Sequence, residues 1–216
     1  MPPRYTALWH HEGRNGFPRF LLGGLVTVRP ILQIGDPGLR EQTRELGLEE
    51  LRGDLVQAGI DDLIETMRHA KGAGLAANQV GWQVRACVIE VKDNPRYPYK
   101  PNIPLTVLVN ARWSPLSDER FECYEGCLSV PDLRGMVARH VEIRVQALDR
   151  HGAPLDFVVR GLSAGTYQHE LDHLDGRLFV DAVEDRASFA SWASFERYHK
   201  EAFSARARAL VDRFGA

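Results

Sequence analysis

The chain has 216 residues, of which 44% are hydrophobic and 26% are charged, a composition that suits one globular domain with a full hydrophobic core. Its formal net charge of −2 argues against a protein whose whole surface is built to bind nucleic acid or a membrane. The longest apolar run, residues 20–28, contains two glycines and is too short to span a bilayer.

Residues 1–28 show no helical or strand period and mix aromatic residues, glycines and a pair of histidines. We predict three parts: a poorly ordered extension over 1–28, a main domain over 29–185, and a helical tail over 186–216 that packs on this domain. Because bacteria can initiate at valine codons, a start at Val26 or Val28 is a further hypothesis, which the intact mass of the natively expressed protein tests.

The first regular elements follow Pro30. Residues 37–51 have turn and helix-start character. Residues 54–70 predict a helix, because their apolar side chains recur at helical spacing. These side chains are Leu55, Val56, Ile60, Leu63, Ile64 and Met67.

Strands are predicted over 84–91 and 106–110, with a proline-rich loop over 93–104 between them. Residues 141–148 mostly alternate apolar and polar side chains, which indicates a half-buried strand. The turn DRHG then returns the chain into residues 154–159, so we predict a β-hairpin.

Two helices complete the chain, one over 163–175 and a long one over about 187–214. Strands followed by helices within one chain indicate an α+β fold. We expect antiparallel β-sheets packed around the first of these helices, with the second as a C-terminal helix.

The three cysteines are an odd number and a poor disulfide framework, which points to a reducing compartment such as the cytoplasm. Cys87 lies in the apolar stretch ACVIEV and is interpreted as a core residue. Cys123 and Cys127 lie in FECYEGCLSV, where we expect at least one of them to take part in chemistry.

The stretch QHELDH places His169 and His173 four residues apart, so both imidazoles project from one helical face and can share a cation. Glu170, beside the first histidine, can take a proton from an attacking water. The alternative is a solvated amphipathic helix that carries two histidines by coincidence.

Two familiar layouts for the third ligand can be compared with the sequence. In HExxHxxGxxH, Gly176 fits, but Phe179 stands where the third histidine is needed. The second layout takes a glutamate further downstream, and Glu196 is the candidate, although the apolar stripe around it favours a solvated position. A peptidase that uses Glu196 therefore stays an alternative.

Cys127 is the better third ligand. A thiolate with two neutral imidazoles suits iron, zinc, nickel or cobalt, and it leaves an open fourth position, as in a hydrolytic site. Cys123 is the competing thiol, which we interpret as pocket lining or core. The HExxH helix is then the central, metal-binding element of the predicted fold.

Three stretches, GAGLAANQVG (72–81), EGCLS (125–129) and QHELDHLDG (168–176), together resemble peptide deformylase in their order and spacing. The resemblance covers roughly residues 31–181, including ILQIGDPGLR and SVPDLRG. GAGLAA does not predict a dinucleotide-binding turn, because it follows a helical segment where a Rossmann motif follows a strand.

The resemblance implies roles for individual residues. Cys127, His169 and His173 match the metal ligands, and Glu170 matches the general acid–base residue. The other correspondences are Gln79 and the backbone N–H of Leu128 as oxyanion donors, Gly74 as a backbone contact for the substrate peptide, and Glu125 and Arg134 as residues that shape the substrate cleft.

The resemblance also implies the reaction, which is hydrolytic removal of the formyl group from the N-terminal methionine of new proteins, with release of formate. It implies one divalent metal ion, usually Fe²⁺, with Zn²⁺, Ni²⁺ or Co²⁺ as alternatives. The implied partners are N-formylmethionyl nascent polypeptides, without a membrane or a direct nucleic-acid substrate. A non-catalytic metal-binding paralogue is disfavoured, because every residue that the chemistry needs is present.

Several residues keep two interpretations. Asp172 either orients a ligand histidine or a nearby basic group, or is a solvated helix carboxylate. Cys123, Leu162 and the His169 face of the helix are candidates for the methionine pocket. Gly165 departs from the family, which often has arginine there, and we expect it to widen the pocket mouth.

The basic end of the tail, with Arg206, Arg208 and Arg213, predicts either docking on the ribosome or packing on the core.

Overall fold

The computed structural model describes residues 26–93 and 99–215. Its α-helices are α1 (Leu48–Arg52), α2 (Asp54–His69), α3 (Gly161–Leu174), α4 (Trp192–Tyr198) and α5 (Lys200–Phe214). Its strands are β1 (Gly74–Ala76), β2 (Ala86–Val91), β3 (Ile103–Pro115), β4 (Arg120–Cys127), β5 (Val130–His140), β6 (Glu142–Leu148), β7 (Pro154–Arg160) and β8 (Ala190–Ser191). Short 3-10 helices cover Pro37–Arg40, Ala77–Val80, Phe179–Asp181 and Arg186–Ser188.

The strands form two sheets whose neighbours pair antiparallel, which confirms the predicted α+β fold. One sheet has the order β1-β2-β3-β6-β7 and the other has the order β4-β5-β8. β6 and β7 form the predicted hairpin, with Val145 opposite Phe157. β3 pairs directly with β6. The chain between them forms the β4–β5 hairpin, which belongs to the second sheet.

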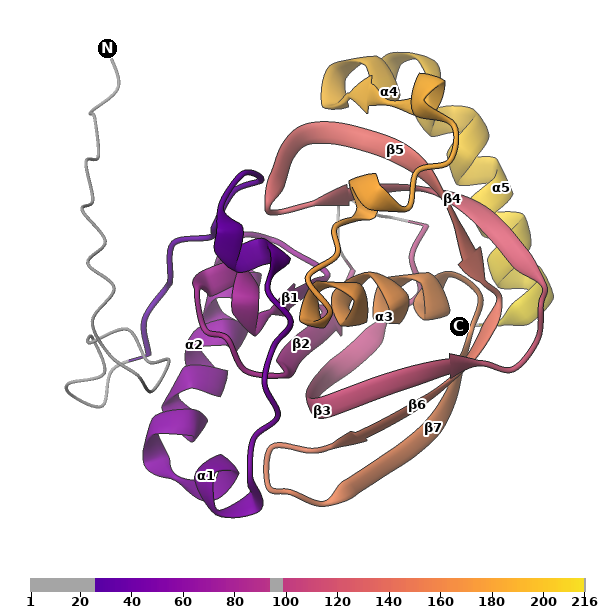
Figure 1. Ribbon diagram of the computed structural model, residues 1–216. Helices are drawn as coiled ribbons and strands as arrows, with labels where there is room; N and C mark the ends of the chain where they lie inside the picture. The colour runs from indigo at the N-terminus through magenta and orange to yellow at the C-terminus, as the bar shows by residue number, and fades with distance from the viewer. Residues whose placement is uncertain (1–25, 94–98, 216) are drawn as a thin grey trace, which may run out of the picture.

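Helix α3 lies between the two sheets (Figure 1). Its residues are buried from Gly161 to Leu174, except for the half-buried His169. Leu171 packs in a cluster with strands of the five-stranded sheet, whereas Leu162 packs in a cluster with Phe121 of β4. Because protein surrounds the helix on both sides, its two histidines lie inside the molecule.

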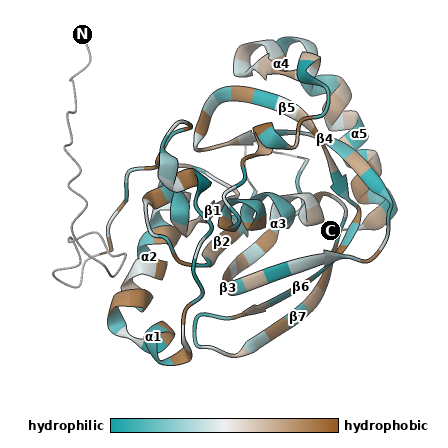
Figure 2. Ribbon diagram, viewed as in Figure 1, coloured by the Kyte–Doolittle hydropathy of each residue, from teal (hydrophilic) through white to brown (hydrophobic). Residues whose placement is uncertain are grey.

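Helix α2 packs against β1 and β2. The predicted stripe is buried at Val56, Ile60, Leu63, Ile64 and Met67, where these side chains meet Leu75 and Val88 of the sheet. β2 itself is hydrophobic over most of its length (Figure 2). The prediction is wrong at Leu55, which is 53% exposed because it lies about 100° around the helix from Val56.

The strand predictions are confirmed in position but not in extent. The predicted strand over 84–91 begins at Ala86, and the predicted strand over 106–110 extends from Ile103 to Pro115. The β4–β5 hairpin is not predicted from the sequence, since its strands carry charged side chains on their buried face. Alternation of apolar and polar residues is therefore weak in both strands.

The prediction of one long helix over 187–214 is wrong, because the tail is broken into several elements. Ala190 pairs with Arg134 as part of β8, and the Ser191 hydroxyl caps α4 by accepting from the Ser194 N–H at 3.2 Å. His199 separates α4 from α5, which lies along β4 (Figure 1). Phe203 of α5 is buried in the cluster that includes Leu162.

The predicted N-terminal extension falls mostly outside the described residues. The backbone N–H of Thr27 donates to Asp62 of α2 at 2.6 Å, and Arg29 forms an ion pair with the same carboxylate. The division of the chain into three parts at residues 28 and 185 remains a prediction. Among the described helices, none has both the length and the apolar character that crossing a membrane requires.

Candidate metal centre

Cys127, His169 and His173 meet beside helix α3. Their ligand atoms all lie within 4.8 Å of one another, and in the described part of the chain they form the one cluster of this kind. Cys127 Sγ lies 3.3 Å from Nε2 of His173. The cysteine comes from the end of β4 and both histidines come from α3, so the cluster joins distant parts of the sequence.

The helix sets the directions of the two imidazoles. Residues four apart lie on one face, and the ring centroids of His169 and His173 are 4.9 Å apart. His169 Nδ1 lies 2.8 Å from a carboxylate oxygen of Glu125, which leaves Nε2 as its ring nitrogen for a metal. His173 directs Nε2 at the thiol.

The neighbouring histidines favour the ionised form of the Cys127 thiol. Burial alone would raise the pKa of its thiol, but the neighbouring His173 and His169 outweigh burial and hold the pKa well below its ordinary value. The thiolate is the form of cysteine that binds metals. One thiolate and two imidazoles fit a divalent first-row metal, and three protein ligands leave a position open for chemistry.

A buried ion network supports His169. Arg139 donates to both carboxylate oxygens of Glu125, at 2.7 and 2.9 Å, and to Asp172 at 2.6 Å. Burial would raise the pKa of Glu125, but Arg139 outweighs it and holds this pKa far below its usual value. Glu125 therefore stays ionised and accepts the hydrogen bond from His169. Asp172 binds a basic group, which was one of its two predicted roles.

Glu170 points into a narrow space beside the cluster. It is buried, and its Oε2 has no hydrogen-bond partner among the described residues. A Cβ atom built on Gly74 would lie 2.4 Å from the Glu170 carboxyl carbon, so only glycine fits opposite this carboxyl group. Burial raises the pKa of Glu170, which favours a group that can both accept and return a proton.

The orientation of the Gln79 amide is fixed by its neighbours. Its oxygen accepts the backbone N–H of Ala76 at 2.8 Å, and this bond identifies the oxygen side of the amide. Its nitrogen then lies 3.0 Å from the Ser129 hydroxyl and 3.4 Å from the Cys127 sulfur. The donor group of Gln79 is therefore held next to the candidate metal position.

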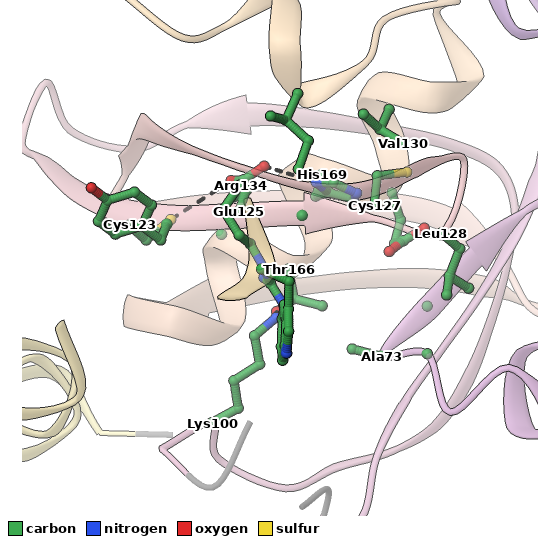
Figure 3. A pocket seen from close by; sticks show the side chains of 18 of the residues that line it. Ala73, Lys100, Cys123, Glu125, Cys127, Leu128, Val130, Arg134, Thr166 and His169 are labelled. Carbon is green, nitrogen blue, oxygen red and sulfur yellow. Dashed lines mark hydrogen bonds and ion pairs between the residues drawn. The ribbon is translucent and has the colours of Figure 1, made fainter. Parts of the chain in front are cut away.

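A cavity of about 360 Å³ connects these residues. Figure 3 shows part of its lining, with Cys127 beside His169 and Glu125 joined to His169 and Cys123. Except for His173, every residue that the resemblance assigns to the site lines this cavity: Gly74, Gln79, Glu125, Cys127, Leu128, Arg134, His169 and Glu170. The predicted methionine-pocket residues Cys123 and Leu162 line it as well.

The competing residues lie elsewhere or make other contacts. Glu196 is on α4, where it forms an exposed ion pair with Lys200 at 2.9 Å. Cys123 Sγ lies 3.6 Å from Glu125 and is not part of the ligand cluster. Gly165 lines the cavity, where a Cβ atom would lie 3.1 Å from the Phe121 ring.

Sequence reasoning misses several residues of the site. Arg139 holds the ion network, but a single arginine at the end of an unpredicted strand carries no signal of its own. Lys100 lies within the proline-rich loop predicted over 93–104; it donates to the Thr166 hydroxyl at 2.9 Å and lines the cavity (Figure 3). Trp192 also lines the cavity, although it was predicted to lie in a packing helix.

Comparisons with known proteins show which proteins the chain resembles. A family model described as polypeptide deformylase matches residues 28–188. The chain is 39% identical over 165 residues to peptide deformylase 1 of Nitrosomonas europaea, across 75% of this chain and 91% of the relative. It is 41% identical over 155 residues to peptide deformylase 2 of a Nostoc species, across 72% of this chain and 86% of the relative.

Solved structures show the same similarity. A class I type b peptide deformylase from Acinetobacter baumannii, described as bound to Met-Ala-Ser, superposes with a TM-score of 0.71 at 34% identity and covers 74% of this chain and 100% of its own. A peptide deformylase from Thermotoga maritima superposes with a TM-score of 0.65 at 29% identity, across 74% of this chain and 99% of its own. The fold around the cluster is therefore that of these enzymes.

Proposed function

The chain belongs to the peptide deformylase family, the hydrolases that remove the N-formyl group from nascent polypeptides, and we propose that Cys127, His169 and His173 hold the metal on which this reaction depends. The observation that carries the assignment is the cluster of their ligand atoms within 4.8 Å, beside the buried Glu170. When bound, the divalent cation would act as a Lewis acid and lower the pKa of a water molecule toward neutrality. The family resemblance implies Fe²⁺, and one thiolate with two imidazoles also suits Zn²⁺, Ni²⁺ or Co²⁺.

Glu170 carries the proton in the proposed mechanism. Its carboxylate takes a proton from the attacking water and delivers it to the methionine nitrogen as the C–N bond to the formyl group breaks. The free Oε2 and the raised pKa of Glu170 support both steps. The products are formate and a peptide with a free N-terminal methionine.

Gln79 and the backbone N–H of Leu128 stabilise the negative charge that develops on the formyl oxygen. The Gln79 amide nitrogen already lies at the cluster, 3.4 Å from Cys127. Leu128 follows Cys127 directly and lines the same cavity. One such donor typically contributes about 3–4 kcal/mol to the transition state.

The substrate peptide extends through the cavity away from the metal. Gly74 offers backbone contact to it, and Arg134 borders its path. Cys123 and Leu162 border the space for the methionine side chain. The Acinetobacter baumannii relative described as bound to Met-Ala-Ser supports a short methionyl peptide as the occupant. Glu125 lines the same cavity and also holds His169, so it supports both the cleft and a proposed ligand.

The wider setting follows from the substrate. Nascent polypeptides and three unpaired thiols favour the cytoplasm. The exposed arginines Arg206, Arg208 and Arg213 on α5 support docking to the ribosome through charge. Arg213 also pairs with Glu119 at 2.8 Å, so part of this surface is already neutralised.

Formate release from formyl-Met-Ala-Ser tests the assignment, with protein purified anaerobically and its metal content measured. We expect turnover in proportion to bound iron, without cleavage of internal peptide bonds. Glu170→Ala should keep its metal and lose nearly all formate release. Metal-loaded protein without turnover would overturn the assignment, and cleavage of internal bonds would point to a peptidase.

A further inference from the structure

The C-terminal tail forms one wall of the cavity. Strand β8 adds to the edge of β5, with Ala190 opposite Arg134. Trp192 directly follows β8, and its backbone N–H donates to Asp132 at 3.1 Å. Trp192 and Phe203 of the tail line the cavity together with Arg134. The tail is thus part of the site as well as a packing element.

Arg134 lies between this wall and the strand that carries a metal ligand. Its guanidinium carbon lies 4.2 Å from the centroid of the Trp192 ring and 5.5 Å from that of Phe195. On the other side, a Cβ atom on Gly126 would lie 2.9 Å from the same guanidinium carbon. Gly126 directly precedes Cys127, so the side chain of Arg134 passes beside the metal ligand without joining it.

The stack defines how Arg134 can act. A guanidinium held over an aromatic ring is attracted by the ring's electron-rich face, which restricts where the charge can lie. Arg134 is only 4% exposed, so this contact is shielded from water and is worth more than it would be on a surface. Arg134 and Trp192 both line the cavity, so a peptide that extends from the metal end meets this pair.

We propose that Trp192 is a positioning residue that holds Arg134 in the cavity wall and thereby sets the affinity for the part of the formyl-peptide beyond its methionine. This inference rests on the proposed function. The tail of this chain would then determine substrate preference by chain length. Substrates of three or more residues bind more tightly because they reach Arg134 beside Trp192, whereas formyl-methionine amide is too short to reach it.

Steady-state kinetics of Trp192→Ala test the inference with two substrates, formyl-Met-Ala-Ser and formyl-methionine amide. We expect KM for the tripeptide to rise about three- to thirtyfold, as expected for loss of a cation–π contact. The rise in KM for the amide should be smaller, and kcat should change less than KM. Trp192→Phe keeps an aromatic face and should restore most of the affinity.

Two further variants separate positioning from general damage. Tyr198→Ala removes an exposed aromatic ring from the same helix, one that packs on Arg197 at 5.1 Å, and it should leave both substrates unaffected. In an Arg134→Ala background, Trp192→Ala should add little to KM, because its effect passes through Arg134.

The outcomes are distinct. An unchanged KM for the tripeptide in Trp192→Ala, or an equal rise for both substrates, would overturn the inference while leaving the reaction itself intact. Additive effects of Trp192→Ala and Arg134→Ala would also overturn it. Absence of formate release by the wild-type protein from both substrates would instead refute the proposed function.

Discussion

Glu125 and His169 are joined by a 2.8 Å hydrogen bond between a buried carboxylate and Nδ1 of the ring. This bond fixes the tautomer of His169 and directs Nε2 toward the ligand cluster. The bidentate contact of Arg139 keeps the same carboxylate ionised. The geometry of one proposed ligand thus depends on two residues that are not ligands.

Glu125→Gln should weaken metal binding. The amide keeps the shape of the side chain but removes the charge that orients and polarises His169, and loss of such a partner typically costs tenfold to a hundredfold in metal affinity. Competition with a chelator of known affinity measures the change. Glu122→Gln, on the exposed face of the same strand, is the matched control. Equal affinities of the two variants would refute this role.

Replacing each of the two thiols near the cavity should affect metal binding differently. Cys127→Ser should lose most of its metal and its activity, because an alcohol is a far poorer soft ligand than a thiolate. Cys123→Ser should retain metal, since its sulfur is outside the cluster. Metal analysis after dialysis against a fixed free-metal buffer measures both variants. If Cys127→Ser retains its metal and Cys123→Ser loses it, the ligand role belongs to Cys123.

Gly74→Ala should abolish most activity with a smaller loss of stability. The added methyl group meets the Glu170 carboxyl group at 2.4 Å and must displace it. We expect kcat to fall about a hundredfold or more, the usual contribution of a general acid–base group. Gly47→Ala, where a Cβ atom meets nothing within 4 Å, is the control. Wild-type kcat in Gly74→Ala would show that Glu170 moves without cost.

Arg139→Met should destabilise the protein by about 3–5 kcal/mol, because it removes the buried cation shared by the carboxylates of Glu125 and Asp172. For a domain of this size we expect the thermal midpoint to fall by roughly 6–20 °C. Calorimetry of metal-free protein removes the contribution of bound metal. Arg144→Met breaks an exposed ion pair with Asp156 and should change the midpoint little.

Glu90 links β2 to α2 and should make stability depend on pH. Hydrogen bonds from Arg68, at 2.7 and 2.9 Å, hold the pKa of Glu90 below its usual value. A lowered pKa stabilises the folded protein above the ordinary carboxyl pKa, and this contribution is lost as pH falls through the folded value.

Glu90→Gln should therefore be less stable than the wild type at pH 7, by about 0.5 kcal/mol since the half-exposed Arg68 is screened by water. The difference should vanish in acid below the ordinary carboxyl range. Urea unfolding of both proteins at several pH values measures it. A difference that stays constant with pH would show that the ion pair is not its source.

Local sequence patterns predict the parts of this site that lie within one helix. His169, Glu170 and His173 are linked by helical spacing alone, and α3 has the predicted position. The cysteine could be ranked by the chemistry of its neighbours. The sequence could not show that Arg139 lies next to Glu125, because that contact depends on the register of the β4–β5 hairpin.

The tail was harder to predict for a similar reason. Phe195 and Phe203 have helical spacing that also fits one continuous helix, and local propensity does not reveal the pairing of Ala190 with Arg134. That contact forms only when β5 offers an edge. Long-range partners thus decided where the predicted helix breaks, and with it the position of Trp192 in the cavity wall.

The burial of α3 between the two sheets affects the way in which the site can be lost. Amide hydrogens of a helix enclosed on both sides exchange with solvent only when the surrounding layers separate, so this helix belongs to the last part of the molecule to open. The two histidines lie on this helix. We therefore expect local fluctuations at the surface to leave the positions of the two histidines unchanged, and inactivation by heat to coincide with cooperative loss of the whole fold.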